Sequence, residues 1–302
     1  MKRLVITLLL VGAISSCIAA QDRGHSREEE DERVDDTVLM HPKAPKVPDF
    51  AVFAGDTLFL DRDDYRERLD RELLSFTFMQ SNSILTLKRS KRIFAMVEPI
   101  LQAQGVDNDL KYLMLIESNL DPKAVSRTGA VGLWQFMKGA AADYGLEVSA
   151  EVDERYNIEK ETVAACQYLK RSYRRFGDWL TAAASYNAGV GGIGKALTEQ
   201  KQTRALELWL TEETSRYMFR LLAAKMFYEH PDWFGFDVPD SERYAYKPPK
   251  EVVTVSDSIP SLVDFALEHG TTYASLRGAN LWLLGTKLTN ATKKTYKIII
   301  PQ

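Results

Sequence analysis

Residues 113–119 read LMLIESN, and this stretch decides how the central part of the chain folds. Four apolar residues lead into Glu117, and Asp107 or Asp109 can cap the helix that carries them. The helix must stop before Pro122, so Glu117 lies near its end. Apolar surroundings and the negative end of the helix dipole both raise the pKa of a carboxyl. The stretch predicts an acid that is protonated near neutral pH, although an exposed or capping glutamate fits the same spacing.

The sequence around this stretch has the spacing of an all-α domain. Apolar residues recur at helical intervals and no alternating strand pattern interrupts them. Helices are expected at 65–78, 84–104, 159–176, 179–188 and 211–230. The third of these is expected to bury one face, made of Val163, Cys166, Leu169 and Tyr173. The domain assigned to this pattern extends over residues 56–240.

After residue 240 the pattern changes to that of a second, smaller domain, 241–302. Runs of β-branched residues flank two short helical segments. The expected order is strand, helix, helix, strand, at 252–255, 259–269, 273–278 and 296–300. The fold class is therefore predicted as mainly α, with a helical domain followed by a small α+β domain.

The amino terminus has the composition of an export signal. Residues 1–20 combine a basic start with an apolar run that is too short to span a bilayer. The letters ISSC at 14–17 resemble a lipobox, which would place a lipid on Cys17, while ordinary cleavage after Ala20 is the alternative. Residues 21–55 are acidic and rich in proline, so we expect a linker. The expected location is the periplasm, or the outer membrane as a lipoprotein.

Composition excludes several classes of function. A net charge of −3 over 302 residues does not favour a nucleic-acid binder, because such proteins need a basic face. After either cut at most one free thiol remains, that of Cys166, and its spacing fits a small core residue rather than a nucleophile. The four histidines are scattered along the chain, so no zinc site is expected.

Further motifs follow Glu117 in a fixed order. They are AVS at 124–126, GAVGLWQFM at 129–137, ASYNAG at 184–189 and ETSRY at 213–217. Together with ESNL at 117–120, they resemble the lytic transglycosylase family, which has a goose-type lysozyme fold, over roughly residues 60 to 232. The likeness is greatest to the family's membrane-bound murein transglycosylase D branch.

The resemblance implies roles for residues at matching positions. Glu117 would be the single catalytic acid and base, and no metal or organic cofactor is implied. The positions implied in substrate binding are Ser126, Gln135, Met137, Tyr186, Asn187, Glu213 and Tyr217. Each has a structural alternative: Ser126 could simply close a turn, and Tyr186 with Asn187 could end a helix. Trp134 is expected in the core.

The implied reaction is cleavage of the β-1,4 bond between N-acetylmuramic acid and N-acetylglucosamine in peptidoglycan. The C6 hydroxyl of the muramoyl residue would attack internally, so that a 1,6-anhydro ring forms and water is not consumed. Two alternatives remain open. A goose-type lysozyme would add water to the same bond and would need a second acid, for which Glu213 is the candidate. A scaffold that only binds peptidoglycan would need no chemistry.

The module at 241–302 resembles a LysM domain, a family that binds glycans containing N-acetylglucosamine. The order of its elements and Asn280 fit that family. The usual Gly-Asp opening is Ser256-Asp257 here, and the usual glycine-rich turn is replaced by the letters TKKT at 292–295. The module is therefore expected either to bind glycan or to serve a structural purpose.

Overall fold

The computed structural model describes residues 39–302. The expected signal peptide at 1–20, the lipidation site at Cys17 and the acidic part of the linker lie outside this range. Within it, the longest helices are too polar or too short to cross a membrane.

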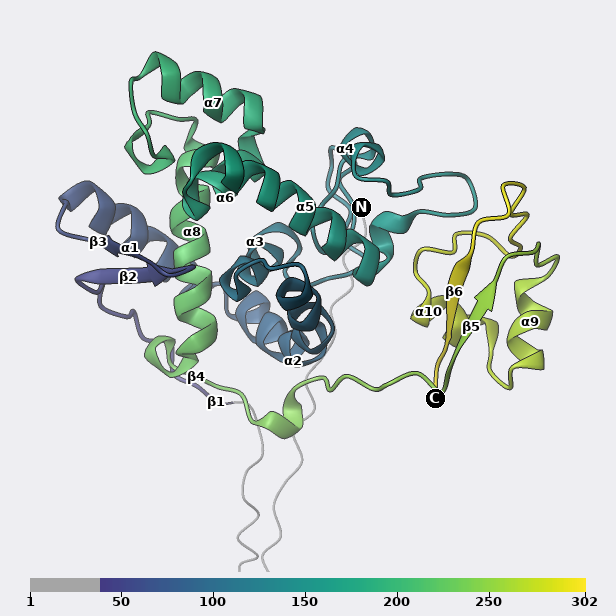
Figure 1. Cartoon of the computed structure of the whole chain (residues 1–302). Coiled ribbons are helices and arrows are strands. Elements are labelled where there is room, and N and C mark those ends of the chain that lie inside the picture. Colours follow the sequence, from purple (N-terminus) through teal and green to yellow (C-terminus); the bar gives the residue numbers. More distant parts are fainter. Residues whose placement is uncertain (1–38) are drawn as a thin grey trace, which may run out of the picture. The chain divides into compact units, whose positions relative to one another are not determined.

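Residues 60–235 are mainly helical (Figure 1). The longer helices are α1 (Asp63–Phe78), α2 (Gln80–Ala103), α5 (Ile158–Phe176) and α8 (Glu212–Glu229). The shorter ones are α3 (Leu113–Ser118), α4 (Lys138–Asp143), α6 (Trp179–Ala188) and α7 (Val190–Glu199). Single 3-10 turns occur at Asn108–Tyr112, Glu154–Tyr156, Ala205–Glu207, Pro231–Phe234 and Asp240–Glu242. The predicted helical class is confirmed, while α7 was not expected from its glycine-rich sequence.

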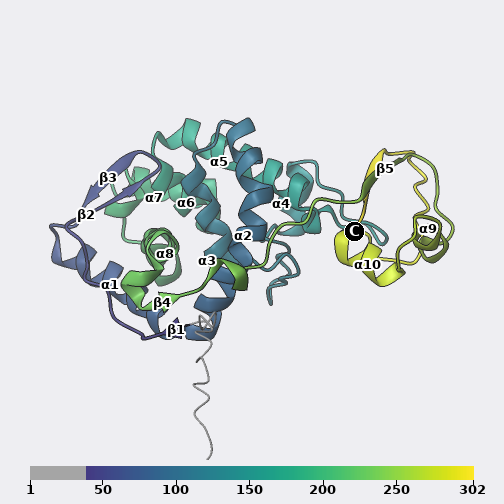
Figure 2. The same ribbon diagram turned by 90° about the horizontal axis from the view of Figure 1, so that it is seen from below.

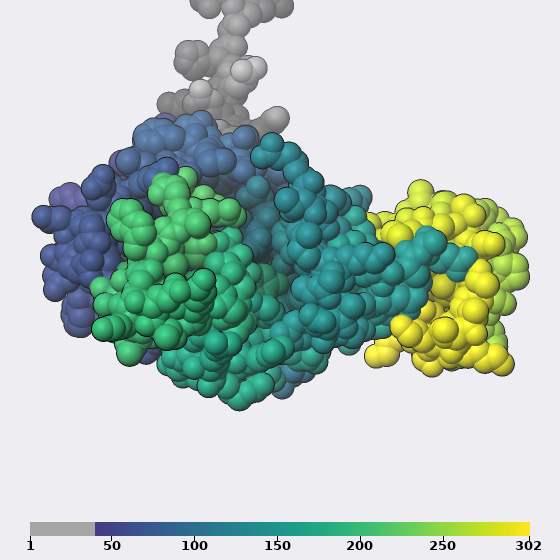
Figure 3. All heavy atoms as spheres, turned by 90° about the horizontal axis from the view of Figure 1, so that it is seen from above, coloured from purple at the N-terminus to yellow at the C-terminus, as the bar shows by residue number. Residues whose placement is uncertain are grey.

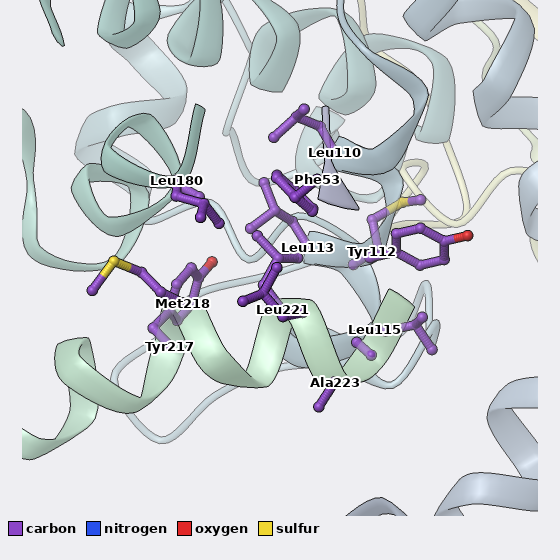
Figure 4. Close-up of a cluster of buried hydrophobic side chains, with 14 of the residues drawn as sticks. Phe53, Leu110, Tyr112, Leu113, Leu115, Leu180, Tyr217, Met218, Leu221 and Ala223 are labelled. Atoms are coloured by element: carbon purple, nitrogen blue, oxygen red, sulfur yellow. The ribbon is translucent and has the colours of Figure 1, made fainter. Parts of the chain in front are cut away.

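Helix α3 is short and buried, and it lies between α2 and α8 in both ribbon views (Figures 1 and 2). As predicted, Asp107 caps the segment that leads into it, by accepting a hydrogen bond from the amide of Asp109. Leu113 and Leu115 of α3 are buried in one hydrophobic cluster with Leu221 of α8 (Figure 4). Because its apolar residues are closely packed in this cluster, α3 is held in a fixed position, and so is the backbone of Glu117.

Part of the expected linker belongs to the folded domain. Strand β1 (Leu39–Met40) pairs with β4 (Phe236–Asp237), and β2 (Phe50–Phe53) forms an antiparallel hairpin with β3 (Asp56–Phe59). Alternate side chains of the hairpin point inward, and that of Phe53 is almost fully buried. The expectation of a linker from 21 to 55 therefore does not hold at β1 and β2, since both strands are paired and Ala51 and Phe53 of β2 are buried in the core of the helical domain.

The buried face of α5 also differs from the prediction. Cys166 and Leu169 are fully buried, as expected. Tyr173 is instead exposed and stacks on Trp179, with ring centroids 4.1 Å apart. The face that packs inward also carries a carboxylate, Glu161, in the first turn of the helix.

The carboxy-terminal module has the predicted order of elements. Strand β5 (Glu251–Val255) and β6 (Tyr296–Ile300) pair antiparallel, with α9 (Leu262–Glu268) and α10 (Tyr273–Ala279) between them. Its core is a separate hydrophobic cluster, in which Leu262, Leu276 and Ile298 are fully buried. The expectation of a small α+β domain is confirmed.

Candidate active site

The end of α3 fixes the position of Glu117. Asn119 and Leu120 both adopt left-handed backbone conformations, with φ of 52° and 54°, so the chain turns sharply just after Glu117. Arg89 of α2 holds this turn by donating hydrogen bonds to the carbonyl of Asn119 and to the carboxylate of Asp121, each 3.0 Å long. The carboxyl group is therefore held at a defined place by backbone geometry and by an ion pair.

The Glu117 carboxyl group accepts a hydrogen bond from the hydroxyl of Tyr217, at 2.6 Å. Burial raises the pKa of Glu117 from 4.5 to about 7, and the negative charge of Glu213 adds to this increase. The bond from Tyr217 and the positive charge of Arg220 act in the opposite direction and lower the pKa. The predicted rise is confirmed. A carboxyl with a pKa near 7 can donate a proton and accept it again at neutral pH.

Tyr186 lies near Glu117 on the adjacent helix α6. Its hydroxyl donates a hydrogen bond to the carbonyl of Trp134, at 2.8 Å, and its pKa is raised by burial and by the charge of Glu117. Trp134 is fully buried, as predicted. Tyr186 thus joins the surroundings of the catalytic candidate to the segment that follows α3.

Asn187 and Glu213 form a second group beside it. The side-chain amide of Asn187 donates to the Glu213 carboxylate at 3.2 Å, and its oxygen accepts from the hydroxyl of Thr214 at 2.8 Å. Glu213 is exposed, in the first turn of α8. These bonds orient Asn187, and they place Glu213 close enough to influence Glu117 electrostatically.

The other three predicted positions lie on one loop, residues 124–137, which we call the 124–137 loop. The Ser126 hydroxyl accepts a hydrogen bond from the amide of Ala130 at 2.9 Å, so it closes a turn. The side chain of Gln135 donates to the carbonyl of Gly132 at 2.8 Å, and Met137 is exposed just before α4. Unlike Tyr217, the side chains of Ser126 and Gln135 bond within their own loop.

Sequence reasoning missed three charged residues in this region. Arg220 lies near Glu117, while Arg155 and Glu161 bond to the 124–137 loop. Glu161 carried a signal, because it occupies the same helical face as the buried Leu169. Arg155 stands in the charged run DER, which reads as solvated surface. Among the described residues, histidines, cysteines and carboxylates do not gather in groups of three or more that could hold a metal ion.

Two parts of the chain match known protein families, and the first of them contains this site. Residues 98–208 match the Transglycosylase SLT domain family, and residues 251–302 match the Soluble lytic transglycosylase C-terminal LysM-like domain family. The first match contains α3 with Glu117, the 124–137 loop and Asn187. The second begins at β5, ten residues after the expected boundary at 241.

Individual relatives agree with these matches. Membrane-bound lytic murein transglycosylase D of Escherichia coli is 26% identical over 260 residues, which cover 82% of this chain and 56% of that protein. Membrane-bound lytic murein transglycosylase F of Desulfosudis oleivorans is 31% identical over 116 residues, covering 36% and 24%. The chain thus spans about half the length of the first relative.

A solved structure was also found to be similar. It is an inactive mutant of the lytic transglycosylase Slt from Pseudomonas aeruginosa, with 22% identity and a TM-score of 0.39, covering 51% of this chain and 26% of that one. The sequence matches place Glu117 in the first of two consecutive domains. The chain is thus similar to the Transglycosylase SLT domain family over residues 98–208, to the Soluble lytic transglycosylase C-terminal LysM-like domain family over residues 251–302, and to membrane-bound lytic murein transglycosylase D along most of its length.

Proposed function

We propose that the protein is a lytic transglycosylase that cleaves the glycan strands of peptidoglycan, with Glu117 as its catalytic acid and base. The observation that carries this proposal is the Glu117 carboxyl group, which is bonded to Tyr217 and has a pKa of about 7, within a Transglycosylase SLT domain. The names of the homologous murein transglycosylases support the choice of substrate.

In the first step, protonated Glu117 gives its proton to the oxygen between N-acetylmuramic acid and N-acetylglucosamine. The bond from the muramoyl C1 to this oxygen breaks, and N-acetylglucosamine leaves with a hydroxyl group. Protonation is needed because an alkoxide is a poor leaving group. Tyr217 already bonds to one carboxyl oxygen, Oε1. We infer that Oε2 carries the proton.

In the second step, the ionised carboxylate takes the proton from the muramoyl C6 hydroxyl. The oxygen of this hydroxyl attacks C1 at the same time. A 1,6-anhydro ring forms, Glu117 regains its proton and water is not consumed. The hydroxyl of Tyr217 stabilises the carboxylate between the steps, since it donates to the charged form. An internal nucleophile is favoured over water because its effective concentration is very high.

Substrate contacts are assigned on the basis of the family motifs and their placement. We infer that Ser126, Gln135 and Met137 contribute from the 124–137 loop, and that Tyr186 and Asn187 contribute from α6. In the hydrolytic alternative, Glu213 would activate water. Its carboxylate is engaged by Asn187, which favours a supporting role.

The cellular setting follows from the same comparison. The relatives are named as membrane-bound, which supports an exported enzyme in the cell envelope. Lipid attachment at Cys17 and cleavage after residue 20 stay predictions. The polymer partner is peptidoglycan, and the acidic net charge gives no reason to invoke nucleic acid.

Digestion of purified peptidoglycan tests the proposal. The protein should release soluble muropeptides, and it should leave chitin intact, because chitin lacks the muramoyl residue. Equal activity on both polymers, or none on peptidoglycan while binding is retained, would contradict the proposed substrate or the proposed chemistry.

The Tyr217→Phe variant is expected to shift the pH dependence of cleavage. The lost hydrogen bond is one that lowers the pKa of Glu117, so this pKa should rise above about 7. Activity requires the protonated acid at the start of the reaction, and in the wild type it should fall as pH rises through about 7. In the variant this alkaline limb should move to higher pH. A pH–rate profile of kcat/KM measures the midpoint of this limb. A midpoint that is unchanged, or that moves to lower pH, would exclude the assigned contact between Tyr217 and Glu117.

A further inference from the structure

The 124–137 loop is held from two sides by buried charged groups. The Glu161 carboxylate accepts hydrogen bonds from the amides of Leu133, at 3.3 Å, and Trp134, at 3.1 Å. The guanidinium of Arg155 donates to the carbonyl of Gly129 at 3.0 Å and to that of Phe136 at 3.2 Å. Gly129 lies near the middle of the 124–137 loop and Phe136 near its end, so the Arg155 side chain links two separate parts of the loop.

This loop needs external support because of its backbone. Gly129 and Gly132 have φ of 86°, and Gln135, which carries a side chain, has φ of 53°. A non-glycine residue in this region is uncommon and persists where the surroundings enforce it. Since Gln135 is one of the proposed substrate contacts, the groups that enforce this conformation also position that contact.

Arg155 is itself fixed by Asp153. The pair is bidentate, with bonds of 2.9 and 2.7 Å, and both side chains are more than nine-tenths buried. A planar guanidinium held by both carboxylate oxygens cannot turn away from its carbonyl partners. The orientation of Arg155 therefore depends on the position of residue 153.

That position is set by the carboxy-terminal module. The amide of Asp153 donates to the carbonyl of Trp282 at 2.9 Å, and the amide of Leu284 donates to the carbonyl of Glu151 at 2.8 Å. Between them, Val152 is 1% exposed and belongs to the hydrophobic cluster of the module. Residues 147–155, which we call the docking hairpin, thus add a short antiparallel segment to the module. In Figure 3 the teal segment that includes this hairpin lies against the yellow module.

Side chains reinforce this contact at the first residue of the docking hairpin and at its turn. Glu147 accepts hydrogen bonds from Lys294 at 2.8 Å and from the hydroxyl of Tyr296 at 2.9 Å. Glu151 accepts from both the amide and the hydroxyl of Thr289, each at 2.6 Å. The combination of a buried valine, backbone pairing and four side-chain bonds describes an attachment of fixed geometry rather than a loose tether.

We propose that the LysM-like module braces the 124–137 loop through the docking hairpin, and that Arg155 is the positioning residue that transmits this support. The proposal rests on the proposed function, and it assigns the module an indirect role in cleavage, through the position of the 124–137 loop. Even a glycan too short to reach the module should be cleaved less well when the contact between module and docking hairpin is weakened.

Two full-length variants test the brace. Arg155→Lys keeps the charge but cannot bond to Asp153 bidentately while reaching both carbonyls. Glu151→Ala removes the bonds to Thr289 and leaves the 124–137 loop itself unaltered. The matched control is Asp240→Ala, which removes an exposed carboxylate that pairs with Lys91 in another part of the domain.

The first readout is hydrogen exchange of the amides in the 124–137 loop, which does not depend on activity. We expect exchange to accelerate by about tenfold in Arg155→Lys and by a few-fold in Glu151→Ala, with no change in the control. Since Glu151 is partly exposed, its variant should fold even if the Arg155 variant does not. Unchanged exchange in Glu151→Ala would overturn the brace.

The second readout is the kinetics of a short soluble glycan of alternating N-acetylglucosamine and N-acetylmuramic acid. We expect KM to rise by about tenfold in Arg155→Lys and a few-fold in Glu151→Ala. The pH midpoint set by Glu117 should stay where it is, because neither substitution alters the contacts of that carboxyl. An unaltered KM, or a fall in kcat alone, would contradict the proposal that Arg155 positions the 124–137 loop for substrate binding. If the wild type cleaves no peptidoglycan, the proposed function fails, while hydrogen exchange still decides whether the brace exists.

Discussion

The Glu117→Gln variant should lose cleavage of peptidoglycan almost completely, with kcat reduced by about a thousandfold or more. The amide keeps the shape of the side chain and can still accept the hydrogen bond from Tyr217. The amide has no acidic proton to give to the leaving oxygen and is too weak a base to take one from the C6 hydroxyl, so both steps are affected. The rate of muropeptide release by the variant and by the wild type, measured under both steady-state and single-turnover conditions, checks this. Activity within a few-fold of wild type would exclude Glu117 as the acid.

The same variant should not be less stable than the wild type. The pKa of Glu117 in the folded protein is about 7, above its ordinary value of 4.5, so the folded state binds more protons between these pH values. The stability of the wild type should therefore fall as pH rises from about 4.5 to 7, and the variant should lack this contribution. Thermal unfolding at pH 5 and pH 8 measures the difference. Glu199→Gln, at the exposed end of α7, is the matched control and should change neither activity nor this pH dependence.

The Gly132→Ala variant should be strongly destabilised, by about 3 kcal/mol or more, because two penalties coincide. A Cβ atom at this position would lie 2.0 Å from the carbonyl oxygen of Arg155 and 2.4 Å from the Glu161 carboxylate. The backbone φ of 86° also disfavours any side chain. Relief of the clash would move the 124–137 loop away from both groups that hold it. Urea unfolding measures the loss of stability, and the remaining folded protein should cleave poorly.

Gly139→Ala provides the control for this prediction. Gly139 lies within α4, and a Cβ atom there would meet no other atom within 4 Å. Alanine favours the helix, so stability should be unchanged or higher by up to about 1 kcal/mol. Equal stability of the two variants would contradict the tight packing described for Gly132.

Sequence reasoning reached the site because its key signals are local. The apolar residues of α3, the cap at Asp107 and the stop before Pro122 all lie within ten positions of Glu117. They indicated a buried carboxyl with a raised pKa, but an exposed or capping glutamate fitted the same spacing, and the order of the surrounding motifs was needed to choose between the two. The bond between Glu117 and Tyr217 joins residues 100 positions apart, and the family resemblance had placed Tyr217 only among the substrate-binding positions.

The features that were missed depend on tertiary contacts. Alternate residues of β2 are buried in the structure, but its sequence FAVF is apolar throughout, and the acidic and proline-containing residues before it favoured a linker. Arg155 acts on carbonyls 19 and 26 residues earlier in the chain, and no local pattern marks such bonds. The docking hairpin likewise could not be predicted from hydrophobic periodicity, because the segment it pairs with lies in the carboxy-terminal module.

Mass spectrometry of the fragments released from purified peptidoglycan distinguishes internal attack by the C6 hydroxyl from hydrolysis. We expect muropeptides that end in 1,6-anhydromuramic acid, each lighter by one water than a hydrolytic product, with no uptake of ¹⁸O when the digestion is run in ¹⁸O-labelled water. Fragments with reducing muramic ends that carry this label would contradict the internal attack, and Glu213 would then become the first candidate for a base that activates water.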